Sequence, residues 1–213
     1  MTMKNILVLG ARGKIARHAI DLLLKKKDYN LTLYLRKAKR LGKIDSNRVR
    51  VIEGDVLDFK TLKKAMEGQD VVYANLDGEL EKQAKNILKA MSEWGIKRLI
   101  FITSLGIYDE VPGKFGAWNK KMIGKYLRPY RKAADVIEAS DADYTILRPA
   151  WLTDNDEVDY EITQKNKPFK GTEVSRKSVA ALVVKLIQHQ TTEIRKSLGV
   201  NKPNTDGEKP SFY

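Results

Sequence analysis

The chain has 213 residues, of which 42% are apolar and 31% are charged, and it carries a net charge of +13; this balance is typical of one folded α/β domain and not of a disordered chain. It contains no cysteine and only two histidines, which argues against disulfides, a cysteine nucleophile, a Ser-His-Asp triad and a metal centre. No apolar run is long enough to span a membrane, and the first residues lack the apolar core of a secretion signal, so we expect a cytoplasmic protein with no membrane partner.

Short β-rich runs alternate with amphipathic helical stretches along the chain, which predicts a parallel sheet built from βαβ units. The predicted strands are residues 4–9, 31–35, 49–53, 70–75, 98–102 and 143–147. The predicted helices are residues 13–27, 59–67, 79–94, 129–140 and 176–190. The fourth is expected to begin at Pro129, because proline suits a first helical position. We therefore expect an α/β fold, a Rossmann-like doubly wound parallel sheet in one domain over residues 1–200.

The first strand runs through the sequence GARGKIA into the first helix. Gly10 is able to adopt the unusual φ of a tight strand-to-helix turn, Gly13 lets the backbone approach a pyrophosphate, and Ala16 lets the helix pack closely on the sheet. The N–H groups where the helix starts, at Lys14 and Ile15, face the same phosphates. In this position the motif predicts a dinucleotide-binding loop and not an ordinary βα turn.

The second strand ends in Arg36, where NAD-binding units usually place a carboxylate that binds the ribose hydroxyls. A guanidinium binds a phosphate instead, and Arg12 of the glycine loop is able to contact the same phosphate. We therefore expect NADP(H) to be preferred over NAD(H).

Most of the positive charge gathers near this loop, since the first 50 residues hold 14 Lys and Arg against three Asp and Glu. A positive field over an anion site explains this distribution. A solvated basic surface and a nucleic-acid groove are the alternatives, and we do not expect nucleic acid because the basic block lacks a recognised binding motif.

Two regions and the end of the sequence interrupt the βα alternation. Residues 103–120 carry three glycines and a proline, which predicts a mobile loop. Residues 151–172 begin with an acidic run, Asp154 to Glu161, and are predicted to form a small hairpin inserted on the substrate side. Residues 201–213 are expected to be a loosely ordered tail.

The glycine loop, the LR after the second strand, GDVLD at residues 54–58 and YTILRPAWLTD at residues 144–154 resemble the pattern of a known family. With these segments the chain is similar to the atypical short-chain dehydrogenases/reductases of the NmrA-like, NAD(P)H-binding class, near the NAD(P)-dependent epimerase/dehydratase group. The resemblance covers about residues 4–190.

This resemblance implies further contacts with the cofactor. In order from adenine through ribose to nicotinamide, the residues that it places there are Asp55, Val56, Ala74, Asn75, Leu76, Thr103, Ser104 and Pro149. Residues 149–152 would also form part of the substrate wall. Arg148 is interpreted mainly as a member of a structural ion pair.

Short-chain reductases use Ser, Tyr and Lys, with Tyr and Lys four residues apart on one helix face so that the lysine lowers the pKa of the tyrosine. Ser104 matches the serine, but the Y-x-x-x-K pattern is missing. The residues nearest to it are Tyr126 and Arg131, although arginine cannot relay a proton as lysine does. Ser104, Tyr126 and Arg131 are thus the candidate catalytic residues, and Tyr108 is a further proton donor candidate. The alternative is a degenerate site in which Tyr126 and Tyr130 only pack.

Phe115, Trp118 and Trp151 are candidates for the apolar walls of a substrate pocket, or else for core or oligomer contacts.

Taken together, the sequence favours an NADP(H)-binding oxidoreductase that transfers hydride to a small carbonyl, quinone or flavin acceptor. The alternative is a non-catalytic NADP(H)-sensing regulatory protein of the NmrA type, favoured by the broken Tyr/Lys pair and by the acidic run. A small-molecule substrate is expected, and a homo-oligomer is compatible with the sequence.

Overall fold

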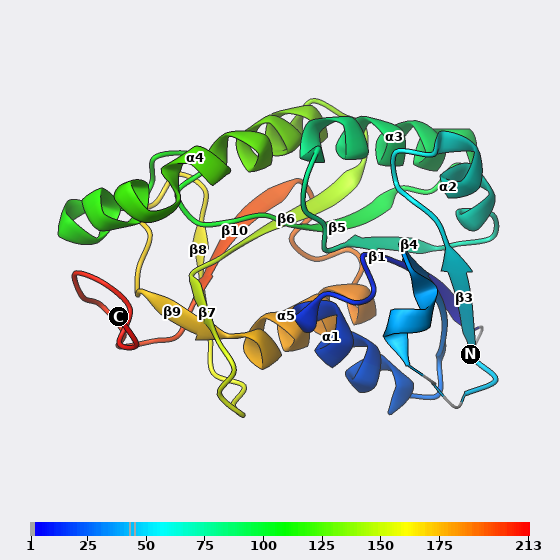
Figure 1. Ribbon diagram of the computed structural model, residues 1–213, viewed down its shortest axis with the longest axis horizontal. Helices are drawn as coiled ribbons and strands as arrows, with labels where there is room; N and C mark the ends of the chain where they lie inside the picture. Colours follow the sequence, from blue (N-terminus) through cyan, green and yellow to red (C-terminus); the bar gives the residue numbers. More distant parts are fainter. Residues whose placement is uncertain (1–2, 43, 45) are drawn as a thin grey trace.

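Strands and helices alternate through most of the chain (Figure 1), and the computed structural model describes residues 3–42, 44 and 46–213. The strands are β1 (Lys4–Leu9), β2 (Tyr29–Leu35), β3 (Val49–Glu53), β4 (Val71–Ala74), β5 (Arg98–Ile102), β6 (Asp143–Pro149), β7 (Trp151–Thr153), β8 (Glu161–Gln164), β9 (Glu173–Ser175) and β10 (Lys196–Asn201). The helices are α1 (Lys14–Leu24), α2 (Phe59–Ala65), α3 (Leu80–Glu93), α4 (Gly113–Glu138), α5 (Arg176–Gln188) and the short 3-10 helix η1 (Ala38–Leu41).

Eight strands form one sheet in the order β3-β2-β1-β4-β5-β6-β10-β8. β1 lies in its interior, where Val8 pairs with Leu33 of β2 and with Tyr73 of β4. The neighbours in this sheet run parallel except β8, which pairs antiparallel with β10. The strand order reverses between β1 and β4, and doubly wound sheets bind ligands at the carboxyl ends of the strands beside such a reversal.

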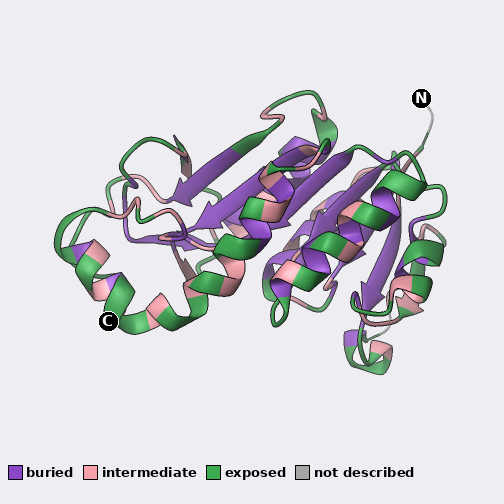
Figure 2. Cartoon of the chain, turned by 90° about the horizontal axis from the view of Figure 1, so that it is seen from above, coloured by how far each residue is buried: buried purple, intermediate pink, exposed green. Residues whose placement is uncertain are grey.

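Helices cover both faces of the large sheet (Figure 1, Figure 2). α1 and α5 pack against each other on one face, while α2, α3 and α4 form a row on the other. Ile6 and Val8 of β1 belong to the apolar cluster that includes residues of α1 and α5, and Leu7 and Leu9 belong to the cluster that includes residues of α2, α3 and α4. A strand buried on both faces reads as an uninterrupted apolar run, which explains the sequence ILVL. Within the described part of the chain, no helix combines the length and apolar character needed to cross a membrane.

The predicted fold class and most of the predicted elements are confirmed. β1, β3 and β5 have the predicted bounds, and β2, β4 and β6 differ from them by one or two residues. The helix α1 buries the predicted apolar stripe: Ile15, Ala16, Ala19, Ile20 and Leu23.

The predicted start of the fourth helix is wrong. α4 begins at Gly113, so Pro129 lies inside the helix, and the last part of the predicted mobile loop at residues 103–120 is helical. Proline removes one backbone hydrogen bond from a helix. α4 nevertheless forms because it buries Phe115, Ala133 and Ile137 and packs along α3. Tertiary packing thus outweighs the local signals of proline and glycine.

The hairpin predicted within residues 151–172 does not form. β7 pairs with β9 in a separate two-stranded sheet, and β8 pairs with β10, a strand absent from the prediction. The tail after β10 lacks helices and strands, but it is not loosely ordered. The backbone N–H and the hydroxyl of Ser211 donate to the buried carboxylate of Glu173 at 2.6 and 2.9 Å, and the Tyr213 ring packs on Trp118.

Candidate functional site

The glycine loop lies between β1 and α1, at the carboxyl edge of the sheet. Gly10 has a left-handed φ of 77°, and a Cβ there would lie 2.1 Å from the backbone oxygen of Asn75. A Cβ on Gly13 would lie 2.1 Å from the side-chain nitrogen of Asn75. Both glycines are required because the chain that leaves β4 packs directly against the loop. In the part of the chain that the structure describes, no side chain caps the start of α1, so its first N–H groups remain available to an anion.

A cleft of about 750 Å³ opens over this loop. The lining residues selected from the sequence are Gly10, Arg12, Gly13, Lys14, Ile15, Arg36, Asp55, Val56, Asn75 and Leu76. Leu152, expected in the substrate wall, also lines the cleft, as do Lys37 and Arg40 of the basic run that follows Arg36. The lining residues that the sequence analysis missed are Tyr34, Leu35, Gly54, Asp77, Gln83 and Arg176. Four residues that the sequence analysis also assigns to the cofactor do not line the cleft: Ala74, Thr103, Ser104 and Pro149. Several missed residues directly precede or follow a selected one, so longer segments at each strand end would have included them.

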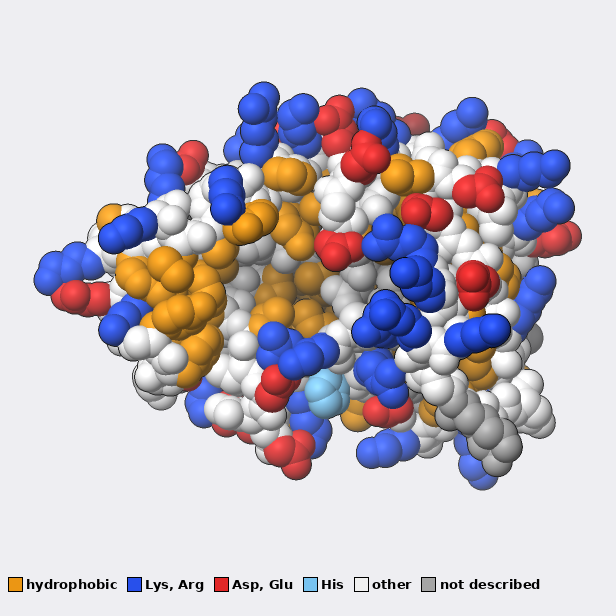
Figure 3. Space-filling view, in the orientation of Figure 1, with side chains coloured by type: hydrophobic (Ala, Val, Ile, Leu, Met, Phe, Trp, Pro, Cys, Tyr) orange, Lys and Arg blue, Asp and Glu red, His pale blue; other side chains and the backbone are white. Residues whose placement is uncertain are grey.

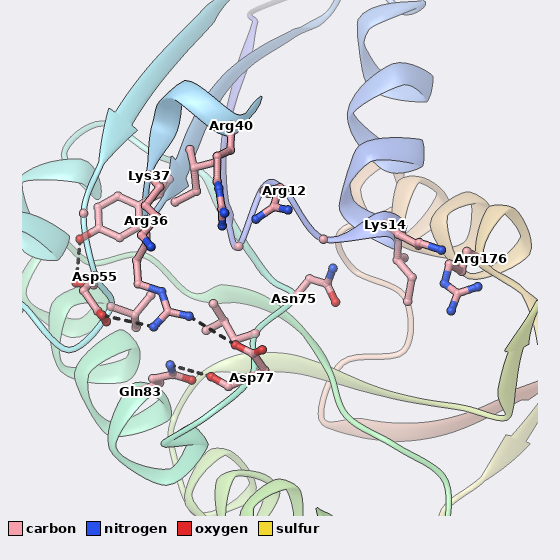
Figure 4. Close-up of a pocket in the computed structure, with 18 of the residues that line it drawn as sticks. Arg12, Lys14, Arg36, Lys37, Arg40, Asp55, Asn75, Asp77, Gln83 and Arg176 are labelled. Atoms are coloured by element: carbon pink, nitrogen blue, oxygen red, sulfur yellow. Dashed lines mark hydrogen bonds and ion pairs between the residues drawn. The ribbon is translucent and has the colours of Figure 1, made fainter. Parts of the chain in front are cut away.

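Cations gather along the rim at one end of the cleft (Figure 4): Arg12, Arg36, Lys37 and Arg40. Arg36 is 66% exposed, and its terminal nitrogens lie 3.8 Å from a carboxylate oxygen of Asp55 and 3.7 Å from one of Asp77. Ion pairs this exposed contribute little to stability. The Arg36 guanidinium therefore remains able to bind an incoming phosphate.

The floor below this rim consists of Tyr34, Gly54 and Asp55. The Tyr34 hydroxyl donates to the carbonyl oxygen of Asp55 at 2.9 Å, and a Cβ on Gly54 would lie 2.3 Å from the hydroxyl oxygen. Burial, followed by the nearby carboxylates Asp58 and Asp55, raises the pKa of Tyr34. The hydroxyl consequently stays protonated and keeps donating, which holds the segment after β3 in place.

Gln83 of α3 brings a buried polar group to the same end of the cleft. Its Nε2 donates to the carbonyl oxygen of Asp77 at 3.0 Å. Its Oε1 is shielded from solvent and has no hydrogen-bond partner within residues 3–42, 44 and 46–213. A buried acceptor without a donor costs about 1–3 kcal/mol, and Gln83 is one of the residues that line the cleft. A ligand N–H at this point would satisfy it.

At the other end of the cleft, one carboxylate joins the starts of α1 and α5. Asp154 accepts from Lys14 Nζ at 2.9 Å and from Arg176 Nη1 at 2.8 Å, and Figure 4 shows these two cations side by side. The hydrogen bond from Lys14, followed by the charge of Arg176, lowers the pKa of Asp154. The acidic run continues in the same way, since Asp156 pairs with Lys177 and Glu157 pairs with Lys202.

The predicted catalytic residues are not brought together by hydrogen bonds in the described structure, and none of them lines the cleft. The Ser104 hydroxyl donates to the carbonyl oxygen of Leu105 at 3.2 Å. Tyr126 is 56% exposed. Arg131 Nε donates to Asp135 at 2.7 Å. Because Tyr126 and Arg131 are five residues apart on α4, they point about 140° apart around the helix.

Tyr108 is also not placed as a proton donor. Its hydroxyl donates to Glu138 at 2.9 Å, and the Lys165 ammonium lies 4.3 Å from its ring centroid. Burial raises the pKa of Tyr108, so the phenol gives up its proton less readily. Arg148 is buried in an ion pair with Glu110, which confirms its structural interpretation.

The three candidate wall residues pack together, and Tyr213 joins them. Trp118 lies 6.1 Å from Phe115 and 4.8 Å from Trp151, measured between ring centroids. Figure 3 shows a hollow on this face with hydrophobic side chains in its floor, cations gathered on one side and an apolar patch on the other. The arrangement suits a ligand with an anionic end and an apolar end.

Comparison with known proteins gives matches over almost the whole chain. The model of a family described as NAD(P)H-binding matches residues 10–190. A Rossmann-fold NAD(P)-binding family protein from Shigella flexneri is 49% identical, with a TM-score of 0.86 over 99% of this chain and 100% of that one. A short-chain dehydrogenase/reductase from Veillonella parvula, solved in complex with NADP, is 34% identical, with a TM-score of 0.92 over 98% of this chain and 99% of that one. A Bacillus subtilis protein named uncharacterized sugar epimerase YhfK is 23% identical over an alignment of 208 positions that covers 90% of this chain and 91% of YhfK.

Proposed function

Since the chain belongs to the NAD(P)H-binding family, within the atypical short-chain dehydrogenases/reductases, we propose that it is an oxidoreductase that prefers NADP(H) and transfers hydride to a small carbonyl, quinone or flavin acceptor. The observation that carries the proposal is the basic rim beside the end of β2, where Arg36 stands with Arg12, Lys37 and Arg40. In a doubly wound fold the adenosine ribose lies at this strand end. Guanidinium groups there favour a ribose that bears a 2′-phosphate.

The residues of the cleft fit a dinucleotide along its length. Gly10 and Gly13 bring no side chain to the two points where the loop packs against Asn75, and the first N–H groups of α1 face the place that a pyrophosphate would take. The free Oε1 of Gln83 lies at the adenine end, and the amino group of adenine is a donor. The volume of about 750 Å³ is within the usual range of ligand sites.

Bound NADPH would supply the hydride, and this chain would supply orientation of the acceptor and proton transfer. We propose that Ser104, at the end of β5, orients the acceptor oxygen. Tyr126 and Arg131 would deliver the proton, although Tyr126 is exposed and points to another side of α4 than Arg131. A quinone or flavin can take its proton from water, so its reduction depends less on a proton donor of the protein than the reduction of a simple carbonyl does. The geometry therefore favours the conjugated acceptors among the three.

The alternative of an NADP(H) sensor is less favoured because the acidic run is already paired. Asp154, Asp156 and Glu157 each contact a cation of the same chain. A partner protein would have to displace these contacts in order to bind there. Nucleotide binding without turnover would support the sensor.

The first experiment is calorimetric titration with NADPH and NADH of the wild type, Arg36→Glu and Arg50→Glu. Arg50 is an exposed cation of β3 outside the cleft, so its variant controls for net charge. We expect NADPH to bind at least about tenfold more tightly than NADH, with the preference lost in Arg36→Glu and kept in Arg50→Glu. Absence of binding by both nucleotides below millimolar concentration would rule out the enzyme and the sensor together. NADPH oxidation in the presence of menadione, flavin mononucleotide or diacetyl then distinguishes the enzyme, which turns over, from the sensor, which does not.

A further inference from the structure

Four aromatic residues meet beside the cleft, and we call them the aromatic wall: Phe115, Trp118, Trp151 and Tyr213. The Tyr213 ring lies edge-on to both tryptophans, with its centroid 5.1 Å from each. The wall joins α4, β7 and the tail after β10, which are far apart in the sequence. Aromatic pairs at this spacing stabilise each other beyond the effect of buried area, so the wall is a defined structural unit.

The aromatic wall adjoins the cofactor cleft through β7, although its four residues are not among those that line the cleft. Trp151 is followed in β7 by Leu152, which lines the cleft together with Arg176. The cations and the apolar patch lie on opposite sides of the hollow (Figure 3). The cations would hold the phosphates of a bound dinucleotide, so its reactive ring would point toward the apolar side. An acceptor that approaches that ring would then lie next to the wall.

Phe115 is buried and the two tryptophans pack on each other, so Tyr213 is the adjustable ring of the four. Trp151 donates through Nε1 to Oδ1 of the buried Asn119 at 2.9 Å and packs on Trp118. Tyr213 is 50% exposed, and its segment is fastened two residues earlier, where Ser211 donates to Glu173. The Tyr213 ring can thus adjust to a ligand while its backbone stays attached.

We propose that Tyr213 is a specificity-determining residue of the acceptor site. Its ring completes the aromatic wall, so a planar conjugated acceptor stacks there, whereas a small aliphatic carbonyl compound gains nothing from it. This inference rests on the proposed oxidoreductase function and adds the part of the chain that selects the acceptor.

The test compares the wild type with Tyr213→Leu, Tyr213→Phe and Phe212→Leu. Leucine keeps apolar bulk without a ring, and phenylalanine keeps the ring without the hydroxyl. Phe212, also 50% exposed, lies 5.3 Å from the Tyr213 ring and gives the matched control. Tyr213→Leu is expected to raise the KM for menadione about three- to tenfold while the kcat/KM for diacetyl stays unchanged. The other two variants are expected to behave as the wild type.

A second readout is the quenching of tryptophan fluorescence by menadione without cofactor. Saturable quenching that weakens in Tyr213→Leu and persists in Phe212→Leu supports the site. Equal changes for menadione and diacetyl, or no change in Tyr213→Leu, would overturn it. If none of the tested acceptors supports NADPH oxidation by the wild type, the proposed function fails. The fluorescence quenching by menadione then tests the role of Tyr213 by itself, and quenching that does not saturate rejects the site. Unchanged NADPH binding by calorimetry shows that each variant is folded.

Discussion

The guanidinium of Arg148 and the carboxylate of Glu110 form an ion pair with side chains that are only 0% and 5% exposed. Arg148 also donates to the Ser197 hydroxyl at 3.1 Å. Glu110 accepts the backbone N–H groups of Gly106 and Tyr108 at 3.1 and 2.9 Å. The pair therefore ties β6 and β10 to the segment that leaves β5, where Ser104 lies. It supports this edge of the site without contacting the cleft.

Glu110→Gln should strongly destabilise the protein, because it leaves the Arg148 charge buried without a counter-ion. Breaking such a pair costs about 3–5 kcal/mol. The exposed pair of Glu208 with Lys114 provides the control, Glu208→Gln, which should change stability by less than about 1 kcal/mol. Urea unfolding of both variants measures the difference. If the two variants lost similar amounts of unfolding free energy, burial of the Arg148–Glu110 pair would not determine its contribution to stability.

Gly10→Ala should destabilise the protein more than Gly68→Ala. Both glycines have a left-handed φ, 77° and 69°, so both substitutions carry a similar backbone cost of about 1 kcal/mol. At Gly10 the added Cβ meets the backbone at Asn75, whereas at Gly68 it meets no atom of the described residues within 4 Å. The difference between the two unfolding free energies isolates the close approach of β4 to the loop. Equal values would contradict it.

Asp77→Asn should tighten NADPH binding and leave NADH binding unchanged. The Asp77 carboxylate lies 3.7 Å from the Arg36 guanidinium, and under the proposed NADP(H) preference it would compete with the 2′-phosphate for that group. An exposed pair of this kind is worth about 0.2–1 kcal/mol, which corresponds to roughly 1.4- to fivefold in affinity. Glu79→Gln, which removes a charge two residues later where Glu79 pairs with Lys82, is the control. A parallel gain for NADH would mean that Arg36 does not read the phosphate.

The stabilisation from Asp154 should depend on pH in the acid range. Its pKa is lowered by Lys14 and Arg176 in the folded state, so its contribution is complete above the unfolded value of about 3.9. It is lost as the pH falls through the lowered pKa. The urea midpoint of Asp154→Asn should lie below that of the wild type at pH 7 and approach it as the pH falls below the unfolded pKa. Asp141→Asn, which alters an exposed carboxylate after α4, should show no such convergence.

The sequence predicts those elements whose local residue pattern agrees with the way they pack in the folded protein. β1, the glycine loop and α1 follow one another with clear periodicity, and the cofactor loop is recognisable for that reason. α4 is misjudged because Pro129 and Gly113 signal helix ends locally, while its packing on α3 is visible only in the structure. Gln83 and Arg176 are missed because topology alone brings α3 and α5 to the cleft.

α4 contains 26 residues, which at 1.5 Å per residue makes it about 39 Å long. Its first part carries Trp118, and its last part is buried through Ala133 and Ile137. Between them Pro129 removes a backbone hydrogen bond, and helices bend most easily at such a point. Pro129 is therefore the point at which α4 bends most easily, between the part that carries Trp118 and the part that packs in the core. A bend there would move Trp118 relative to the sheet and leave the glycine loop in place.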